Sequence, residues 1–188
     1  MMQHHGAPTR LLDWTDSALI ALHFAIRDKQ VPPTGGAIIY VLDPYWLLDQ
    51  INGDDELKRA KKRWEEYAEK DSSVEARDWD RLYLPAYDED FEEKLLDTPA
   101  IPILFDSPHV TRRIAAQRSR FMIFGTDPLW LSSRLGMKDS HLVSISIPST
   151  SISRIRQQLR DAGVTESVVF PDLDGLGREL KQIWRTRR

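Results

Sequence analysis

The sequence predicts an α/β or α+β domain in which a mixed sheet is flanked by helices. Short apolar runs of strand length alternate along the chain with segments whose apolar residues recur at helical spacing. The chain has 188 residues, and no apolar run reaches the roughly 20 residues that a transmembrane helix needs. That length suits a single hydrophobic core. We therefore expect one domain over residues 1–188.

The first part of the chain predicts helices around one strand. Residues 17–26 are apolar almost all round and follow several residues of N-capping type, which predicts a short buried helix. Residues 37–42 form a continuous apolar run, which predicts a strand covered on both faces. Pro44 suits the first turn of a helix through Ile51.

Residues 54–97 are expected to form a charged helical insertion. The segment 54–70 mixes acids and bases around an apolar stripe, which is typical of a surface helix. The stretch that follows it is rich in acids and aromatic residues and has no clear period. We expect that stretch to be an irregular insertion or lid.

Apolar runs in the second part predict further strands. They cover residues 101–105, 121–124, 141–147 and 167–170. The first of these contains Pro102, which cannot donate to a neighbouring strand and therefore favours a position at the edge of a sheet.

Helices are predicted between these strands. Ser107 and the proline after it suit the start of a helix that runs toward Arg118. Apolar residues within 152–162 lie on one helical face, and Gly163 stands where a C′ glycine belongs. Pro171 precedes a last amphipathic helix.

Some polar residues in these segments favour a structural interpretation. Asp172 and Asp174 are expected to cap the last helix. His23 lies inside an apolar helix and is expected to be a core histidine with its polar atoms paired. None of the 29 carboxylates stands in a recognised catalytic spacing.

The composition excludes several kinds of site. The chain has no cysteine, which excludes disulfides, thiolate nucleophiles and thiolate-bound metal centres. His4 and His5 are adjacent and lack the i, i+4 spacing of a helical metal site, so no metal ion is expected. Residues 1–10 lack the apolar core of a signal peptide. We expect a cytoplasmic protein with no membrane partner.

The net charge of −3 is the sum of an acidic first part of the chain and a basic second part. Residues 1–106 carry 12 Lys and Arg against 22 Asp and Glu, a net charge of −10, whereas residues 107–188 carry 14 against 7, a net charge of +7. Arginine dominates the basic part and suits bidentate pairing with phosphate or carboxylate. That part could face the acidic part or solvent, or it could bind a nucleotide, a nucleic acid or a protein target.

Residues 3–15 gather polar groups of several catalytic types, in the order QHHGAPTRLLDWT. The glycine permits backbone angles that other residues avoid, and the proline holds its neighbour extended. Arg10 and Asp13 could form a buried pair that only shapes the turn. Equally, Arg10 could bind a phosphate while His5 transfers a proton.

The run QHHGAPTRLLDWTDSALIALHFA, which begins at Gln3, resembles the signature of FRG domains. Two later runs are similar to further elements of that family, RIAAQRSRF at residues 113–121 and VFPDLDGL at residues 169–176. The ordered matches extend over nearly the whole chain. Ser119 stands where the family has glycine, and only Met1 and Met2 precede the first run, so we expect the Phe-Arg-Gly triplet of the family to be missing.

The resemblance implies an ADP-ribosyltransferase-like fold, with NAD as a substrate and no resident cofactor. The implied activity is an ADP-ribosyltransferase or NAD glycohydrolase, acting as a bacterial toxin or antiphage effector. The alternative is a non-catalytic module that recognises a nucleotide, RNA or a protein partner.

The same resemblance implies roles for residues at matching positions. Arg10 would contact the pyrophosphate, His5 or Thr9 the ribose, and Gln117 would orient the reacting sugar. The implied catalytic residues are His5, Thr9, Arg10 and Gln117. The implied nucleotide-contacting residues are His4, Arg10, Asp13, Trp14 and Arg113.

Overall fold

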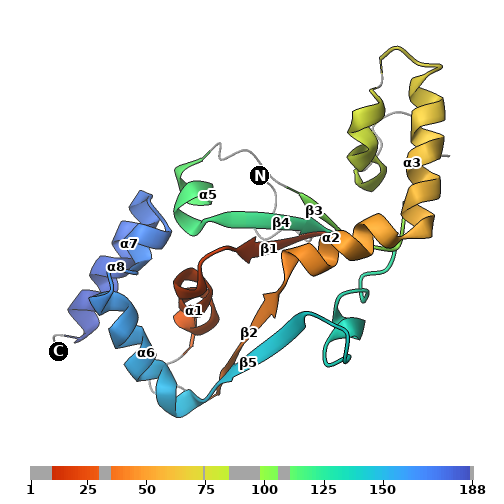
Figure 1. Cartoon of the computed structure of the whole chain (residues 1–188). Helices are drawn as coiled ribbons and strands as arrows, with labels where there is room; N and C mark the ends of the chain where they lie inside the picture. Colours follow the sequence, from red (N-terminus) through yellow and green to blue (C-terminus); the bar gives the residue numbers. More distant parts are fainter. Residues whose placement is uncertain (1–9, 30–34, 74, 85–97, 106–110, 187–188) are drawn as a thin grey trace. The chain divides into compact units, whose positions relative to one another are not determined.

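The computed structural model describes residues 10–29, 35–73, 75–84, 98–105 and 111–186, and its architecture is α+β (Figure 1). The chain divides into two compact units, each built from separate stretches of sequence. Unit 1 comprises Met1–Leu12, Leu42–Phe105 and Phe121–Leu142. Unit 2 comprises Asp13–Val41, Asp106–Arg120 and Val143–Arg188.

Within the described residues the strands form two small antiparallel sheets, so the expectation of one mixed sheet is wrong. One sheet has the order β1-β4-β3, made of β1 (Leu11–Thr15), β4 (Ser119–Ile123) and β3 (Ile103–Phe105). The other pairs β2 (Ala37–Leu42) with β5 (Leu142–Ile147). A mixed sheet needs parallel neighbours joined by crossover connections, whereas β3 and β4 pair antiparallel with Ile103 opposite Ile123. The edge position predicted for the 101–105 strand is confirmed.

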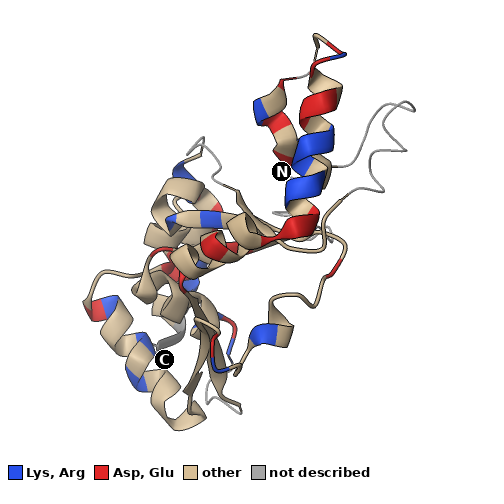
Figure 2. Cartoon of the chain, turned by 45° about the vertical axis from the view of Figure 1, so that its right-hand side comes forward, with Lys and Arg blue, Asp and Glu red and all other residues tan. Residues whose placement is uncertain are grey.

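Unit 1 contains the charged helix that the sequence predicts. Its helices are α2 (Pro44–Gly53), α3 (Asp55–Ala68) and the 3₁₀ helices η2 (Ala76–Tyr83) and η4 (Ser132–Arg134). Leu57, Ala60 and Trp64 form the buried stripe of α3. Figure 2 shows red and blue bands along the rest of this helix, as expected of a solvated surface. Of the expected lid, residues 85–97 lie outside the described residues.

Unit 2 is mainly helical and contains α1 (Ala18–Arg27), α5 (Arg112–Gln117), α6 (Ser149–Asp161), α7 (Glu166–Val169) and α8 (Leu173–Thr186). Its core includes Ile26, Ile147, Ile152 and Leu159, so α1 and α6 pack on one side of the β2–β5 pair. Gly163 has a positive φ of 78° and ends α6, as predicted. The predicted end of α5 is also confirmed, but Ser107 lies outside the described residues and Thr111 caps the helix.

Three local predictions are wrong. Residues 167–170 form no strand, because the amide of Val169 bonds the Thr165 carbonyl and closes the short helix α7. Strand β2 is not covered on both faces, since Ile38 is 53% exposed. Helix α1 is not buried all round, since Phe24 is 40% exposed. In each case the expectation rested on apolar composition alone, which does not show which face of an element will be covered.

No helix within the described ranges is long and apolar enough to cross a membrane.

Candidate functional site

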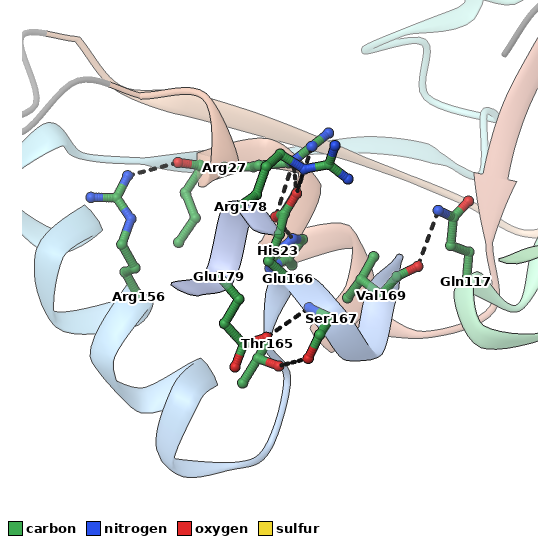
Figure 3. Close-up of polar contacts among 11 residues, drawn as sticks. His23, Arg27, Gln117, Arg156, Thr165, Glu166, Ser167, Val169, Arg178 and Glu179 are labelled. Atoms are coloured by element: carbon green, nitrogen blue, oxygen red, sulfur yellow. Dashed lines mark hydrogen bonds and ion pairs between the residues drawn. The ribbon is translucent and has the colours of Figure 1, made fainter. Parts of the chain in front are cut away.

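The three runs that carry the family resemblance meet in unit 2. The Thr15 hydroxyl, at the end of the first run, donates a hydrogen bond of 2.7 Å to the Gln117 carbonyl in the second. The Gln117 side chain donates in turn to the Val169 carbonyl at 3.2 Å, in the third. Segments that lie far apart in the sequence are therefore joined by buried or half-buried hydrogen bonds, of which Figure 3 shows the one from Gln117 to Val169.

Glu166 is the charged centre of this unit, with a side chain only 2% exposed. The Arg27 guanidinium donates to both carboxylate oxygens, with Nη2 2.6 Å from Oε1 and Nε 3.2 Å from Oε2. Arg178 Nε lies 2.6 Å from Oε1, and His23 Nε2 lies 3.2 Å from Oε2 (Figure 3). Helix α1 places His23 and Arg27 one turn apart on the same face, so both reach the same carboxylate.

The electrostatics of this group favour a charged Glu166 and a neutral His23. Burial alone would raise the pKa of Glu166, but the hydrogen bonds from Arg27 and Arg178 outweigh burial and lower that pKa. Burial lowers the pKa of His23, although the neighbouring Glu166 partly opposes that change. A neutral imidazole then donates its Nε2 proton to Glu166. His23 has a paired polar atom, as expected, but its side chain is 12% exposed and so lies at the margin of the core.

Three arginines surround the buried ring of Phe170, the residue after α7. The Cζ atoms of Arg27, Arg113 and Arg178 lie 4.1, 4.7 and 5.0 Å from the ring centroid. Guanidinium groups favour aromatic faces through cation–π attraction, so Phe170 contributes to holding the Glu166 group together.

Helix α8 begins where the chain must pass close to Phe170. Asp172 Oδ1 accepts the Gly175 amide at 2.7 Å, which confirms its predicted capping role. A Cβ on Gly175 would lie 2.0 Å from the Phe170 carbonyl oxygen. A glycine at position 175 therefore allows α8 to start here and brings Arg178 to Glu166.

A pocket of about 350 Å³ opens beside this group, within unit 2. Its apolar lining comes from Ile26, Leu159, Val164 and Ile183. Its polar lining comes from His23, Arg27, Arg156, Gln157, Arg160, Thr165, Glu166, Glu179 and Gln182. The pocket thus combines an aliphatic surface with three arginines and two carboxylates.

Arg156 and Arg160 lie one turn apart on α6 and both line the pocket. Arg156 Nη2 donates to the carbonyls of Ile26 and Lys29, at 2.9 and 3.1 Å, which holds the guanidinium at the end of α1. Figure 3 shows one of these two bonds. Burial and then the charge of Arg160 lower the pKa of Arg156. Two close cations on one wall make a position where an anion is favoured.

Glu179 lines the pocket from α8. Its Oε2 accepts the Ser167 amide at 2.8 Å (Figure 3). Burial would raise the pKa of Glu179, but hydrogen bonds from Ser167 and Thr165 lower it. The carboxylate is therefore ionised at neutral pH, beside the same pocket as the arginines.

The residues that the sequence predicts for a nucleotide site are distributed over both units. His4, His5 and Thr9 lie outside the described residues. Arg10 belongs to unit 1, where its guanidinium donates to the Tyr83 carbonyl. Asp13 is exposed and lies on β1 in unit 2.

The other predicted residues lie in unit 2. Gln117 is buried and its amide bonds Val169. Two buried donors, Trp14 Nε1 and Arg113 Nε, have no hydrogen-bond partner among the described residues. Buried donors are almost always paired in folded proteins, so these two are positions where an acceptor would be favourable.

Sequence reasoning did not select Glu166, Glu179, Arg156 or Arg160. The i, i+4 spacing of Arg156 and Arg160 in a predicted helix would have indicated that both arginines lie on one helical face. Glu166 carried no such signal, because its partners come from helices that are distant in the sequence. Within the described residues, no group of three or more His, Asp or Glu is placed to hold a metal ion.

Comparison with known proteins supports the first of the three runs. The family model of the FRG domain matches residues 1–33, which confirms the resemblance carried by the run that begins at Gln3. No curated protein and no solved structure matches the chain.

Proposed function

We propose that this protein, whose residues 1–33 match the FRG domain, binds a nucleotide in the pocket between α1, α6 and α8 of unit 2. The observation that carries the proposal is the pair Arg156 and Arg160 beside an aliphatic surface. A nucleotide joins a flat, weakly polar ring to an anionic phosphate, so it needs both kinds of surface within one site.

The size and chemistry of the pocket support a ligand of this class. Small-molecule sites commonly measure about 300–1,000 Å³, so a volume of about 350 Å³ suits a mononucleotide or part of a dinucleotide. Leu159 and Val164 offer an apolar face for the base. Arg160 is exposed and its Nη2 donates to the Gln157 side chain, whereas Arg156 is held by two backbone carbonyls, so phosphate would have to displace only a side-chain contact at Arg160.

Glu166 has a structural role in this proposal. Arg27, Arg178 and His23 already occupy its oxygens, so it is a poor general base. Its group fixes α1 against α7 and α8 and thereby sets the shape of the pocket.

We extend the proposal to NAD, because the family resemblance implies that nucleotide. The further candidate activity is NAD consumption by an ADP-ribosyltransferase-like or glycohydrolase reaction, in a bacterial toxin or defence system; Arg10 and Gln117, two of the residues that the resemblance implies for it, do not line this pocket. A specific observation favours the non-catalytic alternative: the Gln117 amide is buried and already bonds a carbonyl.

Isothermal titration with ADP, ADP-ribose and NAD tests the binding proposal. We expect saturable binding that Arg160→Gln weakens about 10-fold or more, because a hydrogen bond to a charged group is worth about 1.5–3 kcal/mol. Arg154→Gln is the matched control, since Arg154 is exposed on the same helix and does not line the pocket. No binding of any of the three ligands, or equal weakening in both variants, would contradict the proposal.

Release of nicotinamide from NAD tests the candidate activity separately. Enzymatic release that Gln117→Ala abolishes, with ADP binding retained, is expected for NAD consumption. Binding without nicotinamide release would instead favour the non-catalytic module.

A further inference from the structure

We infer that Glu179 hydrogen-bonds the ribose hydroxyls of the ligand, so that the pocket selects ribonucleotides with a free 2′,3′-diol. This inference rests on the proposed nucleotide site and specifies its ligand class. Opposite charges in the pocket come from different helices: Arg156 and Arg160 from α6, and the carboxylate of Glu179 from α8.

The two carboxylates that line the pocket differ in how their oxygens are used. Glu166 accepts from Arg27, Arg178 and His23, and its charge is compensated by two guanidinium groups. Glu179 forms no ion pair with Lys, Arg or His among the described residues; its Oε2 accepts the Ser167 amide, and the Ser167 and Thr165 side chains help to lower its pKa. Within the described residues, the Glu179 carboxylate is therefore stabilised by hydrogen bonds and not by an ion pair.

An ionised carboxylate acts only as a hydrogen-bond acceptor. It is suited to a partner that brings hydroxyl donors, and it is unsuited to a phosphate. The two ends of a nucleotide are thus distinguished within the site, because phosphate is attracted to Arg156 and Arg160 and repelled by Glu179. Sugar hydroxyls are the donors that lie next to the phosphate in every ribonucleotide.

The Ser167 amide fixes the position of the Glu179 carboxylate. The bond to Glu179 Oε2 is 2.8 Å long, and Thr165 also lines the pocket beside it. A carboxylate held by a backbone donor loses little side-chain freedom when a ligand binds, which favours its use in recognition.

Two ligands with an altered ribose test whether the pocket recognises the sugar hydroxyls. Removal of the 2′-hydroxyl takes away one donor, so 2′-deoxy-ADP is expected to bind about 5- to 20-fold more weakly than ADP. A phosphate on that hydroxyl places two anions together, so 2′,5′-ADP is expected to bind more weakly than 5′-AMP, which lacks only that added phosphate.

Titration of these ligands into the full chain and into Glu179→Gln tests the inference. The variant keeps an acceptor but loses the charge, so we expect 2′,5′-ADP to gain affinity relative to 5′-AMP by about 10-fold. Asp174→Asn is the matched control, because Asp174 is an exposed carboxylate on α8 that does not line the pocket. A thermal unfolding curve for each variant checks that it remains folded.

The possible outcomes separate this inference from the proposed function. Equal affinity for ADP and 2′-deoxy-ADP, with Arg160→Gln still weakening both, would overturn the role of Glu179 and leave the nucleotide site intact. A preference for the ribose form that persists unchanged in Glu179→Gln would also overturn it. Failure of every nucleotide to bind would overturn both proposals.

Discussion

Gly175 approaches Phe170 so closely that a Cβ at position 175 would lie 2.0 Å from the Phe170 carbonyl oxygen. The obstacle is backbone, which cannot rotate away as a side chain can. This contact links the start of α8 to the buried ring that Arg27, Arg113 and Arg178 surround.

Gly175→Ala is therefore expected to lower the free energy of unfolding by about 1–3 kcal/mol, the usual cost of overpacking. Gly177→Ala is the control, because a Cβ at position 177 meets nothing within 4 Å. Alanine favours helix over glycine, so the control is expected to raise stability by up to about 1 kcal/mol. Urea unfolding measures both; equal effects of the two substitutions would contradict the close approach.

Glu166→Gln is expected to destabilise unit 2 by about 3 kcal/mol, because it leaves Arg27 and Arg178 without their shared counter-charge. The two guanidinium groups are partly exposed, so the expected loss of unfolding free energy lies near the lower end of the range found when a buried ion pair is broken. Asp174→Asn, an exposed carboxylate of the same unit, should change stability by less than about 0.5 kcal/mol. A Glu166→Gln protein as stable as the parent would contradict the role of Glu166.

The same carboxylate gives an acid-sensitive contribution to stability. The pKa of Glu166 is lowered in the folded state, so its stabilisation is present above its ordinary pKa of about 4.3 and is lost as pH falls through the folded value. Between pH 5 and pH 3, Glu166→Gln should therefore lose less thermal stability than the parent. An identical decline in both proteins would contradict the lowered pKa.

His23 is expected to add a pH dependence at higher pH. Its pKa is lowered by burial, so the unfolded chain takes up a proton near pH 6.5 before the folded protein does. Stability should therefore fall as pH decreases from 7 to 5. His23→Gln removes the titrating group while keeping a donor for Glu166, so its melting temperature should fall less over the same range. Calorimetry at matched ionic strength measures the difference, and a steeper fall in the variant would contradict the direction.

Arg118 has a left-handed backbone conformation, with φ of 49°, at the C-terminal end of α5. Such a conformation costs a non-glycine residue about 1–2 kcal/mol. Arg118 is exposed, so Arg118→Gly is expected to raise stability by about 1 kcal/mol without loss of packing. Arg118→Ala, which keeps the Cβ, should give no such gain. A gain in both variants would assign the effect to the loss of the Arg118 side chain.

Ser119 stands at a position where the family resemblance leads us to expect glycine. The positive φ falls on Arg118, so Ser119 needs no glycine-like backbone. Ser119 begins β4 and is buried, and a small side chain fits there.

The sequence alone was sufficient for the elements that depend on local chemistry. The stripe of Leu57, Ala60 and Trp64 predicts α3, and Gly163 predicts the end of α6, because helical spacing and a left-handed C′ residue are properties of neighbouring positions. The run that begins at Gln3 also identifies the family that matches residues 1–33.

Local chemistry did not determine the elements whose conformation depends on distant contacts. Residues 167–170 have the composition of a strand, yet they close α7 and bury Phe170 beneath arginines from α1, α5 and α8. Strand β1 was not predicted, because its residues were interpreted only as a functional motif. Pairing with β4 supplies its hydrogen bonds, and β4 lies about a hundred residues away.

The candidate pocket shows the same division between local and tertiary information. Sequence alone determined the helical register that places Arg156 one turn from Arg160, and the arginine-rich composition of residues 107–188. Only the tertiary structure decided that these arginines share a pocket with Glu179. It also decided that the negative charge of Glu166 is paired with the guanidinium groups of Arg27 and Arg178. The physical reason is that the strength and role of a charge depend on its burial and its neighbours, and in this protein those neighbours come from helices that are distant in the sequence.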